Sequence, residues 1–291
     1  MRTQLLALLA LAVAVCGCSH QRPAAQSPTR APAASVTPRV ADLTTNDGFV
    51  PALPIGQYRY TLAETHLVTD ATNLLIHQCM QRLGYSWSVP RVAQPTDDAI
   101  QRTIDSRRYG LTSLTAARMV GYHWPYSASA PSAEPKLDAA GQTALLGPSA
   151  DRTKPGGCAG AALRTLGDNS GPDPAGQLAA QAFAQAQQDP GVQAAFRGWS
   201  RCIAAAGYAY RTPLESIADK RWATPVATAL EKRVAAADVR CAQTERLDRI
   251  WQASEVHFEQ AGIRASYPAI ALEASRHRAI LSAARRVLGL R

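Results

Sequence analysis

The segments CMQRLGYSWSVP (79–90) and CIAAAGYAYRTP (202–213) follow one pattern. Each begins with a cysteine, has Gly-Tyr starting five positions after it, and continues with a second aromatic residue and a proline. Apolar residues at helical spacing precede each segment. Glycine adopts the left-handed backbone that ends many helices, and the aromatic rings can pack back as the chain leaves. The repeat predicts two similar helix ends with a structural rather than a catalytic role.

Helical periodicity continues on both sides of these segments. A proline after a capping residue is typical of a helix start, as at Asp189-Pro190 and Thr224-Pro225. No strand-length alternation of Val, Ile or Thr competes with this pattern. The expected fold class is all-α, with helices at about 62–83, 158–167, 177–188, 190–207, 225–262 and 269–288.

The first eighteen residues predict export. A positive start and an apolar run too short to span a bilayer lead into Val15-Cys16-Gly17-Cys18. Val15 and Gly17 suit a lipobox, in which an aliphatic and a small residue precede the lipidated cysteine. We therefore expect 1–17 to be a signal peptide and Cys18 to carry acyl chains at the outer face of the cell membrane.

The rest of the chain divides by composition. Residues 18–54 are rich in Ala, Pro, Ser and Thr, as in a flexible tether. Residues 55–291 form the expected helical domain, in two loosely repeated halves at about 55–167 and 177–291.

Four cysteines remain in this domain, and in an exported protein we expect them to be oxidised in pairs. Three pairings are possible, and the repeat favours Cys79–Cys158 and Cys202–Cys241, each within its own half. A metal site of four cysteines is the alternative, but the sequence lacks Cys-x2-Cys spacing. No metal and no cofactor are expected.

Several of these features together resemble a group of predicted actinobacterial lipoproteins. The resemblance covers most of the domain and implies localisation and disulfides, but no activity. It rests on the lipobox, the tether, the two repeated helix ends, Gly157-Cys158, Trp199-Ser200-Arg201-Cys202 and Asp238-Val239-Arg240-Cys241.

Acidic or amide residues recur every seven positions along the expected helix 225–262. On a helix they would form one face next to the apolar face. This acidic face has three interpretations: a groove that binds a cation or a basic partner, a face exposed to solvent, and a face paired with the basic C-terminal helix. The last arrangement needs an antiparallel hairpin turned at 262–268. We favour the two structural interpretations. The residues are Glu231, Asp238, Glu245, Gln252 and Glu259, and the basic ones are Arg276, Arg278, Arg285, Arg286 and Arg291.

Two further polar features have a functional and a structural interpretation. The basic C-terminal helix could instead bind anionic lipid. His66, Asp70, Asn73 and His77 form one stripe, for which we expect a solvated face, because the two histidines are too far apart to share an ion.

The segment Gly121–Tyr126 brings four ring side chains to the start of a long Pro/Ser-rich loop. Packing of the rings on the helices is the favoured interpretation. Stacking on cell-wall sugars is the functional one. The possible ligand contacts are Tyr122, His123, Trp124 and Tyr126.

The sequence contains no familiar catalytic, metal or nucleotide motif. A formal net charge of +9 could attract anionic lipids, wall polymers or nucleic acid, but an excess of this size over 291 residues is more often a solvated surface, and export argues against nucleic acid. We expect a membrane-anchored binding or scaffold module without catalysis, with cell-wall polymer or an envelope protein as partner. The alternatives are an envelope hydrolase acting on wall polymers and an accessory subunit of a membrane complex.

Overall fold

The computed structural model describes residues 48–88, 91–94, 96–125, 135–168 and 171–290, which belong to one compact unit. Cys18, the expected signal peptide and the tether as far as residue 47 lie outside the described residues.

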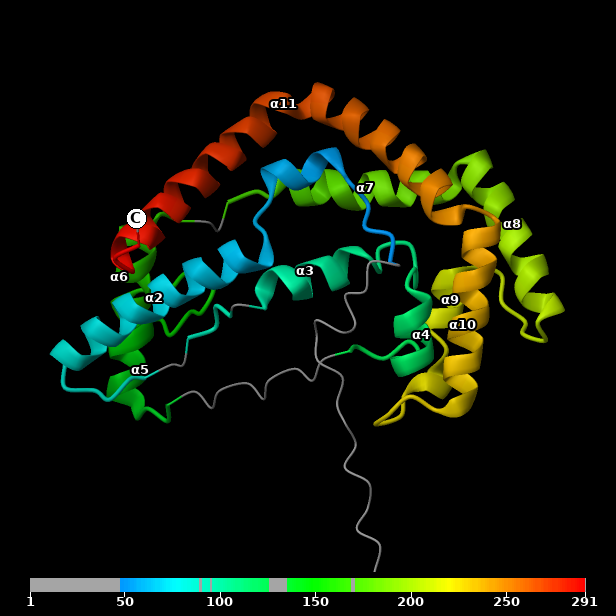
Figure 1. The fold of residues 1–291 in the computed structure, drawn as a ribbon. Coiled ribbons are helices and arrows are strands. Elements are labelled where there is room, and N and C mark those ends of the chain that lie inside the picture. Colours follow the sequence, from blue (N-terminus) through cyan, green and yellow to red (C-terminus); the bar gives the residue numbers. More distant parts are fainter. Residues whose placement is uncertain (1–47, 89–90, 95, 126–134, 169–170, 291) are drawn as a thin grey trace, which may run out of the picture. The chain divides into compact units, whose positions relative to one another are not determined.

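Every regular element in the described part of the chain is helical, so the all-α prediction is confirmed (Figure 1). The elements are η1 (Pro54–Tyr58), α2 (Leu62–Arg82), α3 (Asp97–Asp105), α4 (Leu114–Val120), α5 (Ala139–Leu146), α6 (Gly157–Leu166), α7 (Pro174–Gln188), α8 (Pro190–Ala205), α9 (Pro213–Ile217), η2 (Lys220–Trp222), α10 (Ala229–Thr244) and α11 (Leu247–Val287).

Local capping signals explain where the predicted helices begin. Asp189 caps α8 by accepting hydrogen bonds from the backbone N–H groups of Gly191 and Val192, and Pro190 opens the helix. At the start of α2, Thr61 and Glu64 form a capping box. Both helices therefore begin where their sequence predicts.

The two repeated segments end α2 and α8 in the same way. Gly84 has φ +81° and Gly207 has φ +90°. In each, the N–H of the next tyrosine donates to a carbonyl in the last helical turn, Tyr85 to Met80 and Tyr208 to Ile203, both at 3.0 Å. The predicted structural role of the repeat is confirmed.

Disulfides tie each of these helix ends to a second helix. Cys79 at the end of α2 is bonded to Cys158 at the start of α6, and Cys202 near the end of α8 is bonded to Cys241 on α10. The Cα–Cα distance is 5.6 Å in both. The predicted pairing is confirmed, and the four cysteines are not a metal site.

The expected helix over 225–262 is helical for most of its length, but its predicted start and continuity are wrong, and so is the hairpin after it. The helix α10 begins at Ala229 and is capped by Thr228, not by Thr224. The chain breaks instead between α10 and α11, where Arg246 adopts a left-handed conformation at φ +52° without any glycine or proline nearby. It then continues helically through Gly262 and Pro268 to Val287, with non-helical backbone only at Ser266. A proline can be kept inside a helix at the cost of such a kink.

Packing against α7 explains why α11 continues past Gly262. A Cβ atom at Gly262 would collide with the Leu178 side chain of α7, so the glycine permits close approach of the two helices and not a chain reversal. Helix α11 also packs on η1, α2 and α8. It therefore contacts both helices that end in the repeated segments.

We expect Gly84→Ala and Gly207→Ala each to lower the free energy of unfolding by about 1–2 kcal/mol, because an L-residue at positive φ is strained. A Cβ meets no atom within 4 Å at either position, so the cost comes from the backbone alone. Gly56→Ala is the matched control, since its Cβ also meets nothing and its φ is not positive. Chemical denaturation measures all three; equal effects at the three positions would contradict the assignment.

Candidate functional site

The segment Gly121–Pro125 leaves the end of α4 and lies against α10. The structure describes Tyr122, His123 and Trp124 of the four predicted ligand contacts, and Tyr126 lies outside the described residues. These three side chains differ in exposure: Tyr122 is buried, His123 is half-buried and Trp124 is 52% exposed.

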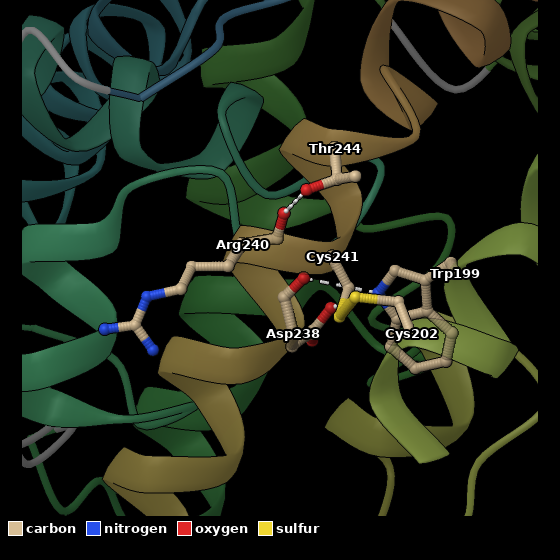
Figure 2. Close-up of a disulfide and its surroundings, with 6 residues drawn as sticks. All are labelled: Trp199, Cys202, Asp238, Arg240, Cys241 and Thr244. Carbon is tan, nitrogen blue, oxygen red and sulfur yellow. Dashed lines mark hydrogen bonds between the residues drawn. A yellow bond between two sulfur atoms is a disulfide. The ribbon is translucent and has the colours of Figure 1, made fainter. Parts of the chain in front are cut away.

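Tyr122 is fastened to a buried carboxylate on α10. Its hydroxyl donates to Asp238 Oδ2 at 3.0 Å, and its ring stacks on Trp222 at 5.8 Å between centroids. Asp238 also accepts a hydrogen bond from Trp199 Nε1 at 2.9 Å, which Figure 2 shows beside the Cys202–Cys241 disulfide. Tyr122 thus joins the loop to the helices α8 and α10, which the Cys202–Cys241 disulfide connects.

Burial raises the pKa of Asp238 to about 7 and outweighs the hydrogen bonds from Ser216, Tyr122 and Trp199, which lower it. The Ser216 hydroxyl lies 2.7 Å from the Pro213 carbonyl oxygen and 3.0 Å from Asp238 Oδ2, so its single proton is shared between these two acceptors.

His123 is held from both ring nitrogens. Nδ1 lies 2.7 Å from Glu231 Oε1, and Nε2 lies 2.7 Å from the Thr224 carbonyl. The Thr224 carbonyl and then Glu231 raise the pKa of His123 against the effect of burial, because both oxygens favour a doubly protonated imidazole. Glu231 also accepts the Tyr122 backbone N–H at 2.8 Å, so one carboxylate fixes two consecutive residues of the loop.

Arg107 holds the same loop from its other side. Its guanidinium donates to the carbonyls of Tyr122 at 2.9 Å and of His123 at 2.8 Å. It also lies over the Trp124 ring, 4.8 Å from the centroid. Trp124 is therefore an exposed aromatic residue on a backbone fixed by hydrogen bonds to both of the residues before it.

The acidic residues of α10 and α11 are not the solvated or paired flank that their spacing predicts. Glu231, Asp238 and Glu259 are fully buried, and Glu259 accepts the Ile55 backbone N–H at 3.0 Å. The break at Arg246 changes the face that the later residues present, and the missing hairpin leaves the basic end of α11 away from them. These carboxylates hold loops onto the helices.

The polar stripe on α2 is likewise partly wrong as a solvated face. Asp70 is buried and accepts the backbone N–H groups of Val92 at 2.7 Å and Ala93 at 3.2 Å. His66 Nδ1 lies 2.9 Å from Asp97 Oδ2, and His77 is hydrogen-bonded to the Trp87 carbonyl. The stripe therefore positions the chain that follows α2.

A cavity of about 310 Å³ lies between the residues that follow η1, the first turn of α2, the segment before α7, and α11. Its lining includes Asp173, Glu273 and His277, which are the residue types that a hydrolase would use. Burial first, and Asp173 as well, raise the pKa of Glu273. Both carboxylates accept N–H groups at the start of α7, Asp173 from Gly176 at 2.6 Å and Glu273 from Ala175 at 3.0 Å. They are thus engaged in capping that helix.

Among the described residues, no group of three or more His, Cys, Asp or Glu side chains is arranged to hold a metal ion. No helix in the same part of the chain combines the length and the apolar character needed to cross a membrane.

Comparisons with family models, curated proteins and solved structures found no match. The resemblance to actinobacterial lipoproteins stays a prediction.

Sequence reasoning singled out the segment that contains Trp124 but favoured packing of all its rings, and it missed the residues that hold the exposed indole in place. Arg107 carries no local signal, because arginines that follow a helix, such as Arg107-Arg108 here, are usually solvated. The seven-residue spacing of Glu231 and Asp238 was a real signal, and its interpretation as a solvated flank was wrong.

Asp238 gives the protein a defined dependence of stability on pH. Its carboxyl is neutral in the folded state up to about pH 7, whereas in the unfolded chain it ionises near pH 4. The folded state therefore binds more protons between these values, and this group's contribution to the free energy of unfolding falls as pH rises from about 4 to about 7. Below and above this window the contribution is constant.

We expect Asp238→Asn to remove that component. The difference in free energy of unfolding between wild type and Asp238→Asn should decline across pH 4–7 by an amount on the order of a few kcal/mol. Denaturant titrations at four or five pH values measure it, and Asp151→Asn, at a fully exposed carboxylate, is the control. Parallel pH profiles for wild type and Asp238→Asn would mean that Asp238 is ionised throughout.

Proposed function

We propose that this protein is a lipoprotein anchored through Cys18 at the outer face of the membrane, where it is a non-catalytic binding module for cell-wall polymer. The observation that carries the binding role is Trp124, an exposed ring on a loop held by Arg107, Glu231 and Asp238.

The chemistry of an exposed indole supports a carbohydrate ligand. Its broad apolar face suits the apolar face of a sugar ring. A rigid backbone favours binding, because little conformational entropy is lost when the ligand arrives. Arg107 beside the indole adds a positive charge that suits anionic groups on a wall polymer.

The test is co-sedimentation of the mature chain, from residue 18 and carrying Cys18→Ser, with purified cell-wall sacculi at rising salt. We expect pelleting to survive high salt and Trp124→Ala to weaken it about tenfold, because stacking on a ring contributes roughly 1–2 kcal/mol. Trp124→Phe should retain most of the binding.

Val226→Ala is the matched control for loss of an exposed apolar side chain, since Val226 is 75% exposed on a different segment. Equal loss in Val226→Ala and Trp124→Ala, or pelleting that high salt abolishes, would overturn the proposed role of the aromatic ring. The second result would reduce binding to diffuse attraction by arginine.

The anchor has its own test. We expect Cys18→Ser to move the protein from the membrane fraction to the soluble fraction and to abolish labelling by a palmitate analogue, because the acyl chains are carried by a diacylglyceryl group bonded through a thioether to the Cys18 sulfur. Cys16→Ser is the control and should keep both properties. Labelling that follows Cys16 instead would contradict the assigned cleavage site.

The envelope hydrolase is the alternative that a specific observation favours, namely the cavity lined by Asp173, Glu273 and His277. The same incubation with sacculi tests it, because a hydrolase releases soluble wall fragments with time. An accessory subunit of a membrane complex would instead be found by crosslinking in intact membranes.

A further inference from the structure

The last part of α11 carries a continuous exposed face. At 3.6 residues per turn, its exposed large and charged side chains after the kink at Ser266 fall within roughly 140° of arc. The buried residues Ile270, Ile280 and Ala284 lie on the opposite side, where α2, α6 and α7 pack. The members of this face are Tyr267, Leu272, Arg278, Arg285 and Arg286.

Charge on this face has one sign. Between Gln260 and Leu290, all of which the structure describes, Glu273 is the only acidic residue, and it is buried against the start of α7. Arg276 points inward and donates to the Pro172 carbonyl. Among the described residues, no carboxylate forms an ion pair with Arg278 or Arg285. The exposed face of the helix therefore carries only positive charge.

Apolar side chains lie among these arginines. Tyr267 is 54% exposed and Leu272 is 62% exposed. Small alanines at 269 and 279 leave the helix backbone close to whatever lies against it. Arginines flanking tyrosine and leucine are the composition of helices that lie in a lipid headgroup region, where the rings and aliphatic groups reach the acyl boundary.

We propose that this face of α11 binds the surface of an anionic phospholipid membrane. The proposal goes beyond wall binding, and it rests on the lipid anchor proposed above only in that the anchor keeps a bilayer within reach. A soluble phosphate-bearing polymer would satisfy the arginines equally well, but it offers nothing to Leu272. The exposed apolar groups therefore favour a bilayer.

The experiment measures partition of the mature chain carrying Cys18→Ser into vesicles of phosphatidylcholine with a minority of phosphatidylglycerol, by flotation at about 0.1 M salt, where the Debye length is about 10 Å. We expect binding that pure phosphatidylcholine vesicles do not support. The triple variant Arg278→Gln, Arg285→Gln and Arg286→Gln should lower the partition coefficient on the order of 100-fold, at about fivefold for each arginine near the membrane.

A matched triple controls for net charge. Arg197→Gln, Arg201→Gln and Arg240→Gln remove the same charge from exposed positions on α8 and α10, and should change partition less than about threefold, since surface charges beyond a Debye length are screened. Equal losses in the two triples would overturn the proposal, and so would equal binding to both kinds of vesicle. Circular dichroism confirms that each variant is folded.

Leu272→Ser separates a bilayer from a soluble polyanion. We expect it to lower vesicle partition about tenfold, because the transfer of a leucine side chain out of water is favourable. Binding to soluble polyphosphate should be unchanged. Unchanged vesicle partition would overturn the bilayer as the occupant. Because all proteins in this test lack the Cys18 thiol, the result is independent of acylation, and Trp124→Ala should not affect it.

Discussion

Carboxylates buried on helices, each receiving hydrogen bonds from chain far away in sequence, are the interaction on which the rest of this fold depends. Asp70 holds the segment after α2, Glu231 holds the loop after α4, Glu259 holds η1, and Glu273 holds the start of α7. A buried backbone N–H without a partner is costly, and a buried carboxylate is costly as well, so each satisfies the other. Long-range order in the loops thus comes from a few acidic side chains rather than from a sheet. These hydrogen bonds also explain why the loops between the helices have definite positions.

Features that the sequence predicts well are those with local causes. Helix starts at Asp189-Pro190 and helix ends at Gly84 and Gly207 depend on residues within a few positions, and the disulfide pairing follows from the repeat that these ends define. The break at Arg246 has no such cause, because a non-glycine residue adopts positive φ only when surrounding packing imposes it. Helical continuation past Gly262 is equally non-local, since it depends on close approach of α7. Tertiary packing decided both of these points against local propensity.

The candidate site was predictable only in part, for the same reason. A run of ring side chains marks the segment Gly121–Tyr126, but sequence cannot tell which rings are buried, and the structure buries Tyr122 while it exposes Trp124. The distribution of charge along α10 and α11 is the reverse of ordinary expectation: acids lie inside and arginines outside. A seven-residue acidic spacing is usually a solvated face. Here Glu231, Asp238 and Glu259 face inward, because each accepts a hydrogen bond from another segment of the chain.

The connectivity of the disulfides has a consequence for biogenesis. Numbered along the domain, the first cysteine is bonded to the second and the third to the fourth, so neither bond encloses a cysteine of the other. A chain that emerges from a pore with its N-terminus first presents these thiols in the order in which they pair. An oxidant that joins each new thiol to the one still free would form the native bonds directly, and no disulfide isomerase would be needed to reshuffle them. In a chain exported in this way, the order of the cysteines along the sequence would thus be the order of their assembly.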